Sequence, residues 1–420
     1  MNNKVKKWYK LDNAGKIFPP TSDKNDPKVF RFACELYEDV DKVILQNALD
    51  KTLEEFPMFL SSLKKGLFWY YLETSSIVPK VLEEENYICD KMDKELLFRV
   101  TFYKKRINLE VYHALTDGTG AICFLKTLVA NYLVEKHGIK EQVRIDTSSI
   151  YEKEADSFEK YYSKVKGTKL PKNPKAYILK GRLYPEYRLK VIEGVVPTKE
   201  VIKLAKSYNT TVTVYLTSIL IKSIGMTMTR KEKRKPVIVT IPVNLRKYFK
   251  SDTARNFFNT ITVQYKFNND NDNLDNIIKE VGTQFSAKLT KENLDKQMNS
   301  LAVLENIFIL RLVPVFIKDL VLKYFYKKSR KEQTIALSNV GIVDLPDEIK
   351  DYVKLFDVFA STDCTQICMC SYLDNMTLSF TSHFISPEIQ KTFFTELSNN
   401  NVDVMINTNE VEDISYEEVL

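Results

Sequence analysis

Histidine is scarce in this 420-residue chain, and the first of its three copies ends a stretch that alternates like a β-strand. In residues 107–113 (Ile-Asn-Leu-Glu-Val-Tyr-His), His113 shares parity with Ile107, Leu109 and Val111. Alternate side chains of a strand point to the same face, so His113 is expected on the buried side. An unperturbed imidazole titrates near neutrality and can take a proton from an alcohol or an amine. The chemistry predicted at this position is general base catalysis.

The segment after His113 is expected to turn sharply before a helix. Residues 116–120 (Thr-Asp-Gly-Thr-Gly) favour a turn, and residues 122–134 favour a helix. A side chain between a strand end and a glycine-rich turn lies where a small molecule can reach it. Asp117 is placed to order this loop by accepting hydrogen bonds. Taken alone, a histidine and an aspartate four residues apart are also consistent with a buried structural pair.

The other two histidines fit structural roles better. His137 stands in Glu-Lys-His-Gly at 135–138, where it is expected to cap a helix C-terminus beside glycine. His383 follows a predicted strand at 376–382, and a structural role at the strand end is favoured. The alternative is that His383 approaches the site from the second half of the chain.

The order of strand, His113-x-x-x-Asp117-Gly118 and helix resembles the active-site motif of the chloramphenicol acetyltransferase-like superfamily. That superfamily includes nonribosomal peptide condensation domains, plant-type acyltransferases and alcohol acetyltransferases. Further segments are similar to it at residues 211–216, 242–246 with 255–260, and 338–341. Together they extend the resemblance over about residues 28–398, and the closest branch is that of alcohol acetyltransferases and stand-alone condensation-like proteins. The chain lacks the clear Asp-Phe-Gly-Trp-Gly segment of the plant-type branch.

The resemblance implies a role for each residue of the motif. His113 would deprotonate the acceptor hydroxyl or amine, which attacks a thioester carbonyl directly, without an acyl-enzyme. Asp117 would be structural and paired with an arginine, for which Arg246 is the first choice and Arg99 and Arg31 are rivals. Gly118 would let the loop backbone approach the substrate closely.

The resemblance also implies a second-half contribution to the site. Ser338, with Asn339 as the weaker candidate, would donate a hydrogen bond to the oxyanion of the tetrahedral intermediate. A simple turn of the chain before Gly341 explains these two residues equally well. Side chains expected to line the site are Asn244, Asn259, Asn339 and His383.

Charge and cysteine content exclude several other classes. The net charge is +7, and the basic runs at 231–235 and 327–331 are short, so a nucleic-acid groove is not expected. The runs fit solvated surfaces, and the alternative is attraction of a phosphorylated cosubstrate or a membrane surface. Residues Cys364, Cys368 and Cys370 lack zinc-knuckle spacing and predict a buried reduced cluster, with no metal. The N-terminal residues have no apolar leader, which predicts a cytoplasmic protein.

One segment, residues 307–326, resembles a membrane span but contains Arg311, Pro314, Lys318 and Asp319. It therefore falls short of the roughly 20 apolar residues that a span requires, and no transmembrane helix is expected. A core helix is favoured. The alternative is a helix that lines an apolar tunnel or makes a peripheral membrane contact.

Strands and helices alternate in both halves of the chain, which predicts an α/β sandwich of two lobes. Each lobe is expected to hold a mixed sheet with helices, and the active site a channel between them. The predicted boundaries are an N-terminal lobe at 1–165, a linker or crossover at 166–186, and a C-terminal lobe at 187–420.

The leading hypothesis is an acyltransferase that uses acyl-CoA as cosubstrate, needs no tightly bound cofactor, and acylates a small-molecule or lipid-like acceptor. The second is a condensation-type, amide-forming enzyme whose acyl donor is bound to a carrier protein. The third is a non-catalytic relative that binds a lipid or a partner.

Overall fold

The computed structural model of this chain describes residues 7–85, 87–141, 143–163, 174–268, 272–306 and 312–409. The first half contributes strands β1 (Trp8–Lys10), β2 (Val29–Leu36), β3 (Ser61–Lys65), β4 (Tyr70–Thr74), β5 (Leu82–Glu83), β6 (Phe98–Tyr103) and β7 (Arg106–Tyr112). Its helices are α1 (Phe18–Thr21), α2 (Lys42–Glu55), α3 (Gly118–His137), α4 (Ile150–Glu154) and α5 (Ser157–Tyr161).

The second half contributes the remaining strands, which are β8 (Lys190–Pro197), β9 (Val237–Asn244), β10 (Phe258–Tyr265), β11 (Ile335–Val343), β12 (Val353–Ala360), β13 (Gln366–Tyr372), β14 (Asn375–Ser382) and β15 (Met405–Thr408). Its helices are α6 (Thr198–Ser207), α7 (Val212–Thr227), α8 (Leu274–Lys288), α9 (Lys291–Asn306), α11 (Val315–Ser329), α12 (Asp347–Lys350) and α13 (Glu388–Asn399).

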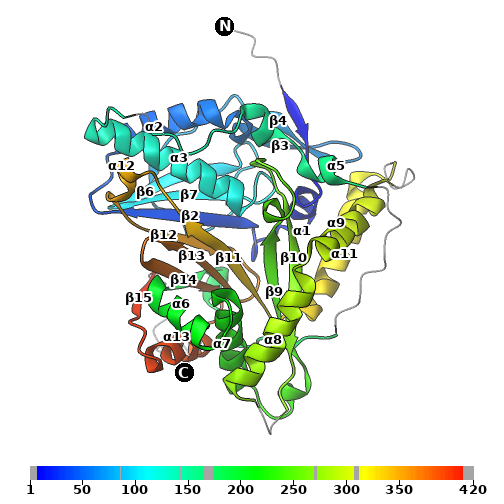
Figure 1. The fold of residues 1–420 in the computed structure, drawn as a ribbon. Coiled ribbons are helices and arrows are strands. Elements are labelled where there is room, and N and C mark those ends of the chain that lie inside the picture. The colour runs from blue at the N-terminus through cyan, green and yellow to red at the C-terminus, as the bar shows by residue number, and fades with distance from the viewer. Residues whose placement is uncertain are drawn as a thin grey trace, which may run out of the picture.

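The strands of the described residues form three sheets. A five-stranded sheet has the order β12-β2-β7-β6-β5, a seven-stranded sheet has the order β10-β9-β11-β13-β14-β8-β15, and β1-β4-β3 form a small third sheet. Both large sheets combine parallel and antiparallel neighbours. Helices α2 and α3 cover the first large sheet, and α6, α7, α8 and α13 pack on the second (Figure 1). The predicted two-lobed α/β architecture is confirmed.

Capping explains where the two helices of the first lobe begin. The Asp41 carboxylate accepts hydrogen bonds from the backbone N–H groups of Val43 and Ile44, at 2.8 and 3.0 Å, so α2 starts at Lys42. Helix α3 starts at Gly118, earlier than the predicted residue 122, because Asp117 caps it in the same way. Its C-terminus is His137 followed by Gly138 at φ +61°, as expected for a left-handed cap.

Strand β12 corrects the predicted lobe boundaries. It lies within the range 187–420 but pairs antiparallel with β2, so it completes the sheet of the first lobe. Helix α5 crosses the other way, since Phe158 packs in the second core and against Phe257. The position of an element in the sequence does not determine which of the two large sheets it joins or packs against. Part of the predicted linker, at 166–173, lies outside the described residues.

Helix α11 corrects the prediction of a core helix near residues 307–326. Within it only Val315 is buried, while six large apolar side chains are exposed. Residues 307–311 lie outside the described part of the chain. Across the described residues, no helix is both long and apolar enough to span a bilayer.

Candidate active site

His113 lies directly after β7, at the point where a second-lobe segment reaches the first lobe. Its backbone N–H donates to the carbonyl of Lys28 at 2.9 Å, which fixes the chain beside β2. The ring stacks on Phe18 with centroids 4.2 Å apart, and it contacts Phe30 and Phe258 at 4.9 and 5.5 Å. Phe18 and Phe30 come from the first lobe and Phe258 from β10. Three aromatic rings thus hold a partly buried imidazole in one orientation.

Asn256 is the hydrogen-bond partner of the His113 ring. Its Oδ1 lies 3.2 Å from His113 Nδ1, and its Nδ2 donates to the backbone carbonyl of His113 at 3.2 Å. The same Nδ2 lies 3.3 Å from Oδ2 of Asp12, and both Asn256 and Asp12 are buried. His113 Nε2 has no hydrogen-bond partner among the described residues, and it is not among their fully buried, unpaired atoms. One ring nitrogen is therefore fixed by protein, while the other is open.

Burial lowers the pKa of the His113 imidazole below its ordinary value of 6.5. A hydrogen bond with the backbone of His113 itself, then the charge of Asp117 and the hydrogen bond with Asn256, act in the opposite direction without reversing the shift. Desolvation disfavours the imidazolium because the cation loses hydration that the aromatic walls do not replace. The ring is consequently neutral at pH 7, which is the form that accepts a proton.

Asp117 points away from His113 and into a buried ion pair. Its carboxylate accepts from Arg246 Nη1 at 2.8 Å and Nη2 at 3.2 Å, and from the backbone N–H of Phe257 at 2.8 Å. The same carboxylate caps α3 through the N–H groups of Thr119 and Gly120. Of the arginines considered from the sequence, Arg246 contacts Asp117, whereas Arg31 and Arg99 bind Glu110.

Arg246 links this carboxylate to the segment that carries Asn256. Beyond Asp117, its guanidinium donates to the carbonyl oxygens of Thr253 at 2.9 Å, Arg255 at 2.6 Å and Phe257 at 3.3 Å. Donors in a rigid planar fork suit several fixed acceptors at once. The ion pair therefore holds residues 253–257 against the loop that follows His113.

Gly120, and not Gly118, is the glycine that the loop requires. A Cβ on Gly118 would meet nothing closer than the Phe32 ring at 3.8 Å, which is ordinary contact. A Cβ on Gly120 would lie 2.1 Å from the backbone oxygen of Ala254 and 2.2 Å from Thr116 Oγ1. The close approach that the structure shows is therefore between Gly120 and the second lobe, whereas the predicted approach of Gly118 to a substrate stays a prediction.

Ser338 and Asn339 lie on β11, and among the described residues neither is hydrogen-bonded to His113 or Asn256. The Ser338 side chain is half-buried, and its hydroxyl has no hydrogen-bond partner in the part of the chain that the structure describes. The Asn339 amide donates to Thr213 Oγ1 at 2.8 Å and accepts from Gly341, which sits at φ +93°. Strands β9 and β11 pair only at two positions, ending at Ala336 opposite Thr240. Ser338 thus lies two residues beyond the point where the pairing of β11 with β9 ends.

The other predicted site-lining residues are held by local structure. Asn244 donates to Thr119 Oγ1 at 3.0 Å and caps the turn that carries Arg246. His383 is buried, with its ring nitrogens 3.2 and 3.0 Å from the carbonyl oxygens of Arg188 and Asn25, so it joins loops and not the His113 cluster. Asn259 alternates with Phe258 on β10 and so faces away from His113, although its Nδ2 is buried and unpaired.

Asn256, Asp12, Phe18 and Gly120 complete the site but are missed by sequence reasoning. Asn256 lies inside the segment 255–260 that resembles the superfamily, but it precedes β10, so no strand pattern marks it. Asp12 and Phe18 belong to an N-terminal stretch without strand or helix periodicity. Only the folded arrangement brings that stretch to His113.

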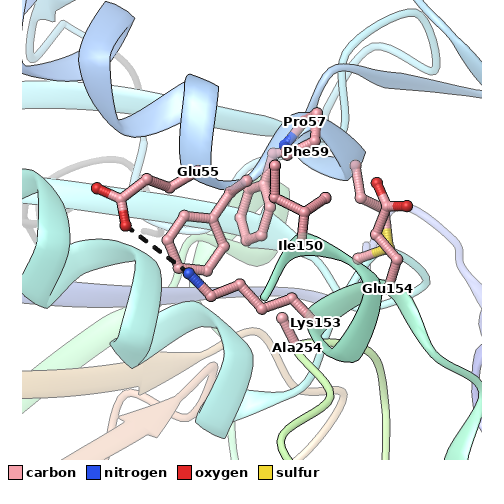
Figure 2. Close-up of a pocket in the computed structure, with 9 residues that line it drawn as sticks. Glu55, Pro57, Phe59, Ile150, Lys153, Glu154 and Ala254 are labelled. Atoms are coloured by element: carbon pink, nitrogen blue, oxygen red, sulfur yellow. Dashed lines mark ion pairs between the residues drawn. The ribbon is translucent and has the colours of Figure 1, made fainter. Parts of the chain in front are cut away.

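A small pocket lies between the end of α2, helix α4 and Ala254 (Figure 2). Its lining includes Phe59, Lys153 and Ala254, and Lys153 Nζ lies 3.8 Å from a Glu55 oxygen. The water-accessible volume is about 10 Å³, which is space for one water and not for an acyl thioester. This pocket is not the reaction site.

Cysteines and metal-ligating groups add nothing to this site. All six cysteines are free, and Cys368 and Cys370 are buried on β13 with Cys364 partly buried nearby. The described residues contain no group of three or more His, Cys, Asp or Glu side chains placed to hold a metal ion.

Comparison with known families supports the superfamily resemblance. Residues 192–383 match the alcohol acetyltransferase family. This match covers a little under half of the chain and contains Arg246, Asn256 and Ser338, but not His113. A comparison with curated protein sequences gives no significant match.

Solved structures extend the likeness to nearly the whole chain. Fusarium sporotrichioides TRI101, complexed with coenzyme A and T-2, aligns with a TM-score of 0.62 at 9% identity, covering 95% of this chain and 99% of that one. The TRI3 trichothecene 15-O-acetyltransferase of the same organism aligns at 0.61 and 12% identity, with 94% of both chains covered. The first condensation domain of the CDA synthetase aligns at 0.60 and 12% identity, covering 95% and 97%. The chain therefore has the fold shared by acyltransferases and condensation domains.

Proposed function

We propose that this protein is an acyltransferase that moves an acyl group from a CoA thioester to a hydroxyl or amine. The observation that carries the proposal is the His113 ring, which is held at Nδ1 by Asn256 and has no partner at Nε2 among the described residues, while burial lowers its pKa. A neutral imidazole with an accessible lone pair is a competent general base. The match to the alcohol acetyltransferase family supports O-acylation as the first choice.

In the proposed reaction, the acceptor O–H or N–H attacks the thioester carbonyl while its proton moves to His113 Nε2. The resulting oxyanion accepts a hydrogen bond from the Ser338 hydroxyl, which has no protein partner in the described residues. The intermediate then collapses, the C–S bond breaks, and the CoA thiolate takes the proton from His113. No covalent acyl-enzyme forms, and no metal is required for an activated thioester.

The deciding experiment follows thiol release from a panel of acyl-CoA donors with His113→Ala. We expect a loss of turnover on the order of 10²–10⁴-fold, the usual contribution of a positioned base. His137→Ala is the matched control, because His137 stacks on Tyr352 at the far end of α3. Equal turnover in both variants contradicts the proposed role of His113.

A condensation-type reaction is the second candidate, because the fold is shared with condensation domains. Its acyl donor would be bound to a carrier protein and its product would be an amide. Turnover with free acyl-CoA and an alcohol favours the first proposal. Turnover only with an acylated carrier protein favours the second, and stable lipid binding without any thiol release favours a non-catalytic relative.

The exposed face of α11 supports a hydrophobic acceptor delivered from a lipid surface. Phe316, Leu320 and Tyr324 lie on this face with Ile317, Val321 and Phe325, and each is at least 40% exposed. Lysines follow at the C-terminal end of the helix. The first turn of α11 also binds the β3–β4 hairpin, where Val315 N–H donates to the carbonyl of Leu67. An apolar face flanked by lysines fits a peripheral contact with an anionic bilayer.

A further inference from the structure

The Asn256 side chain has only one orientation that satisfies its surroundings. Nδ2 lies 3.2 Å from the His113 carbonyl and 3.3 Å from Asp12 Oδ2, and these two oxygens, with Asp12 ionised, only accept hydrogen bonds. Exchanging the amide N and O would place the amide oxygen of Asn256 against the His113 carbonyl oxygen and Asp12 Oδ2, with no hydrogen between them. Oδ1 must therefore face His113 Nδ1, at 3.2 Å.

This orientation selects one tautomer of the imidazole. Because Oδ1 of Asn256 only accepts, the contact at Nδ1 is a hydrogen bond only when Nδ1 carries the proton. In the neutral ring the lone pair then lies on Nε2, the nitrogen without a partner among the residues that the structure describes. The opposite tautomer would place the Nδ1 lone pair against the lone pairs of Oδ1.

Asp12 anchors the amide from the other side. It is 2% exposed, its Oδ1 accepts from the backbone N–H of Gly15 at 2.6 Å, and its Oδ2 lies 3.8 Å from Arg255 Nε. Arg255 is itself fixed, since its guanidinium donates to the carbonyl of Lys10. Burial raises the pKa of Asp12 to about 6, against the lowering effects of Arg255 and the Gly15 N–H, so the group is mostly ionised above neutrality.

We infer that Asn256 is a positioning residue that fixes the tautomer and orientation of His113, and that Asp12 holds Asn256 in place. The chain of contacts joins an N-terminal residue, the second-lobe segment at 253–257, and the strand end of the first lobe. Its catalytic consequence rests on the proposed function, whereas the tautomer of His113 does not. The two are tested by separate measurements.

The tautomer is measured by ¹⁵N NMR of the intact protein labelled at histidine, with the three histidines assigned by substitution. We expect the wild-type His113 ring to carry its neutral-form proton on Nδ1. In Asn256→Leu, which keeps a similar volume, this preference should be lost. Asp12→Asn gives an independent test without loss of volume, because a neutral amide at position 12 no longer requires a donor from Asn256, and mixed tautomers should result.

The double variant Asp12→Asn/Asn256→Asp is the rescue experiment. It exchanges donor and acceptor across the 3.3 Å contact and keeps an acceptor opposite His113 Nδ1, so the Nδ1–H tautomer should return. The variant should be less stable than the wild type, because the carboxylate at position 256 no longer donates to the His113 carbonyl. Asn108→Leu is the matched control: Asn108 is also buried, lies on β7, and donates to Glu84. An Nε2–H tautomer in the wild type, or an unchanged tautomer in Asn256→Leu, overturns the inference.

Kinetics then separate positioning from general structural damage. We expect Asn256→Leu to lower kcat on the order of 10²-fold, as for a misplaced catalytic group, with KM changed only a few-fold. The double variant should recover at least tenfold of that loss, and Asn108→Leu should leave kcat near the wild-type value. If the tautomer changes as expected while kcat does not, Asn256 positions His113 as inferred, but His113 is not the base and the proposed function fails.

Discussion

Asp117 and Arg246 form a buried, two-pronged ion pair across 129 residues of sequence, with contacts of 2.8 and 3.2 Å. Both side chains are less than 10% exposed. The pair ties the cap of α3 to the segment that carries Asn256, and among the described residues no hydrogen bond joins the pair to the His113 ring. Its function is therefore to hold the two lobes in register around the proposed base.

Asp117→Asn should destabilise the protein by about 3–5 kcal/mol, because the guanidinium of Arg246 stays buried without its counter-charge. The measurement is the free energy of unfolding in urea. Asp41→Asn is the matched control, since Asp41 caps α2 through two N–H groups but is exposed and has no ion pair within the described part of the chain. Asparagine caps helices about as well as aspartate, so the control should change little. Equal losses in the two variants would mean that the ion pair contributes nothing beyond the cap.

The glycines of the motif provide a second, sterically defined test. Gly120→Ala should cost about 1–3 kcal/mol and lower turnover, because the new Cβ collides with the Ala254 carbonyl of the second lobe. Gly118→Ala should be nearly neutral in stability, since its Cβ meets only the Phe32 ring at 3.8 Å. Thermal melting of the two variants checks this difference, and a larger loss for Gly118→Ala would contradict the geometry of the loop.

The depressed pKa of His113 predicts the pH dependence of the reaction. Neutral imidazole is the base, so activity is lost as the pH falls through the folded pKa, and burial places that pKa below 6.5. The acid limb of kcat/KM, which reports the free enzyme, should have its midpoint below 6.5. The residual activity of His113→Ala should lack this limb. A limb that persists in His113→Ala belongs to another group.

The predictability of this site from sequence differs from residue to residue. His113 and Asp117 are identifiable because strand parity and a turn before a helix are local patterns. Arg246 requires the superfamily resemblance, since nothing local relates it to Asp117. Asn256 and Asp12 escape because their hydrogen bonds span 143 and 244 residues and leave no periodic signal.

The fold shows the same limit. The determinants of helix α2, its Asp41 cap and its amphipathic face, lie within one segment of the sequence. The sequence of strand β12 contains no signal for the strand that it pairs with, and β12 joins β2 of the first lobe instead of its sequence neighbours. Helix α11 is apolar enough to suggest a core element, yet its apolar face points outward. The apolar composition of a helix alone does not determine whether its apolar face packs in the core or is exposed.

A buried carboxyl at the junction of the two sheets predicts how stability depends on pH. Asp357 on β12 is fully buried, its Oδ1 accepts from Ser379 at 2.6 Å, and its Oδ2 has no donor among the described residues. Burial, and then the charge of Glu193, raise the pKa of Asp357 well above its ordinary value. Burial also favours a raised pKa for Glu193, but Asp357 and the Arg106 guanidinium prevail and lower it to about 2. Asp357 is thus the protonated member of the pair.

Protonated Asp357 contributes stability that is complete below its unfolded pKa near 3.8 and is lost as the pH rises through its higher folded pKa. Asp357→Asn mimics the protonated acid and should remove up to about 1.4 kcal/mol per pH unit from the slope of stability against pH in that window. Urea midpoints between pH 4 and pH 8 measure this slope. Asp351→Asn, on an exposed carboxyl, should leave it unchanged. A wild-type slope retained in Asp357→Asn would assign the proton to another group.

The outward face of α11 predicts binding to lipid. Vesicles containing phosphatidylserine should sediment with the wild-type protein, because Phe316 and Leu320 are 58% and 66% exposed and Lys323, Lys327 and Lys328 are exposed on the same helix. The double variant Phe316→Glu/Leu320→Glu should abolish sedimentation without lowering the melting temperature, since neither side chain is buried. Val43→Glu is the matched control, on an equally exposed apolar residue of α2 that lies on a different helix. If the vesicles fail to bind the wild type, or bind the double variant equally well, the exposed face serves a different purpose, and coverage by another segment of the chain becomes the explanation to test.

Acyl transfer to a hydrophobic alcohol presented in vesicles then links lipid binding to the reaction. A loss of this transfer in the double variant, with normal transfer to a water-soluble alcohol, would show that α11 delivers the acceptor and takes no part in the chemistry.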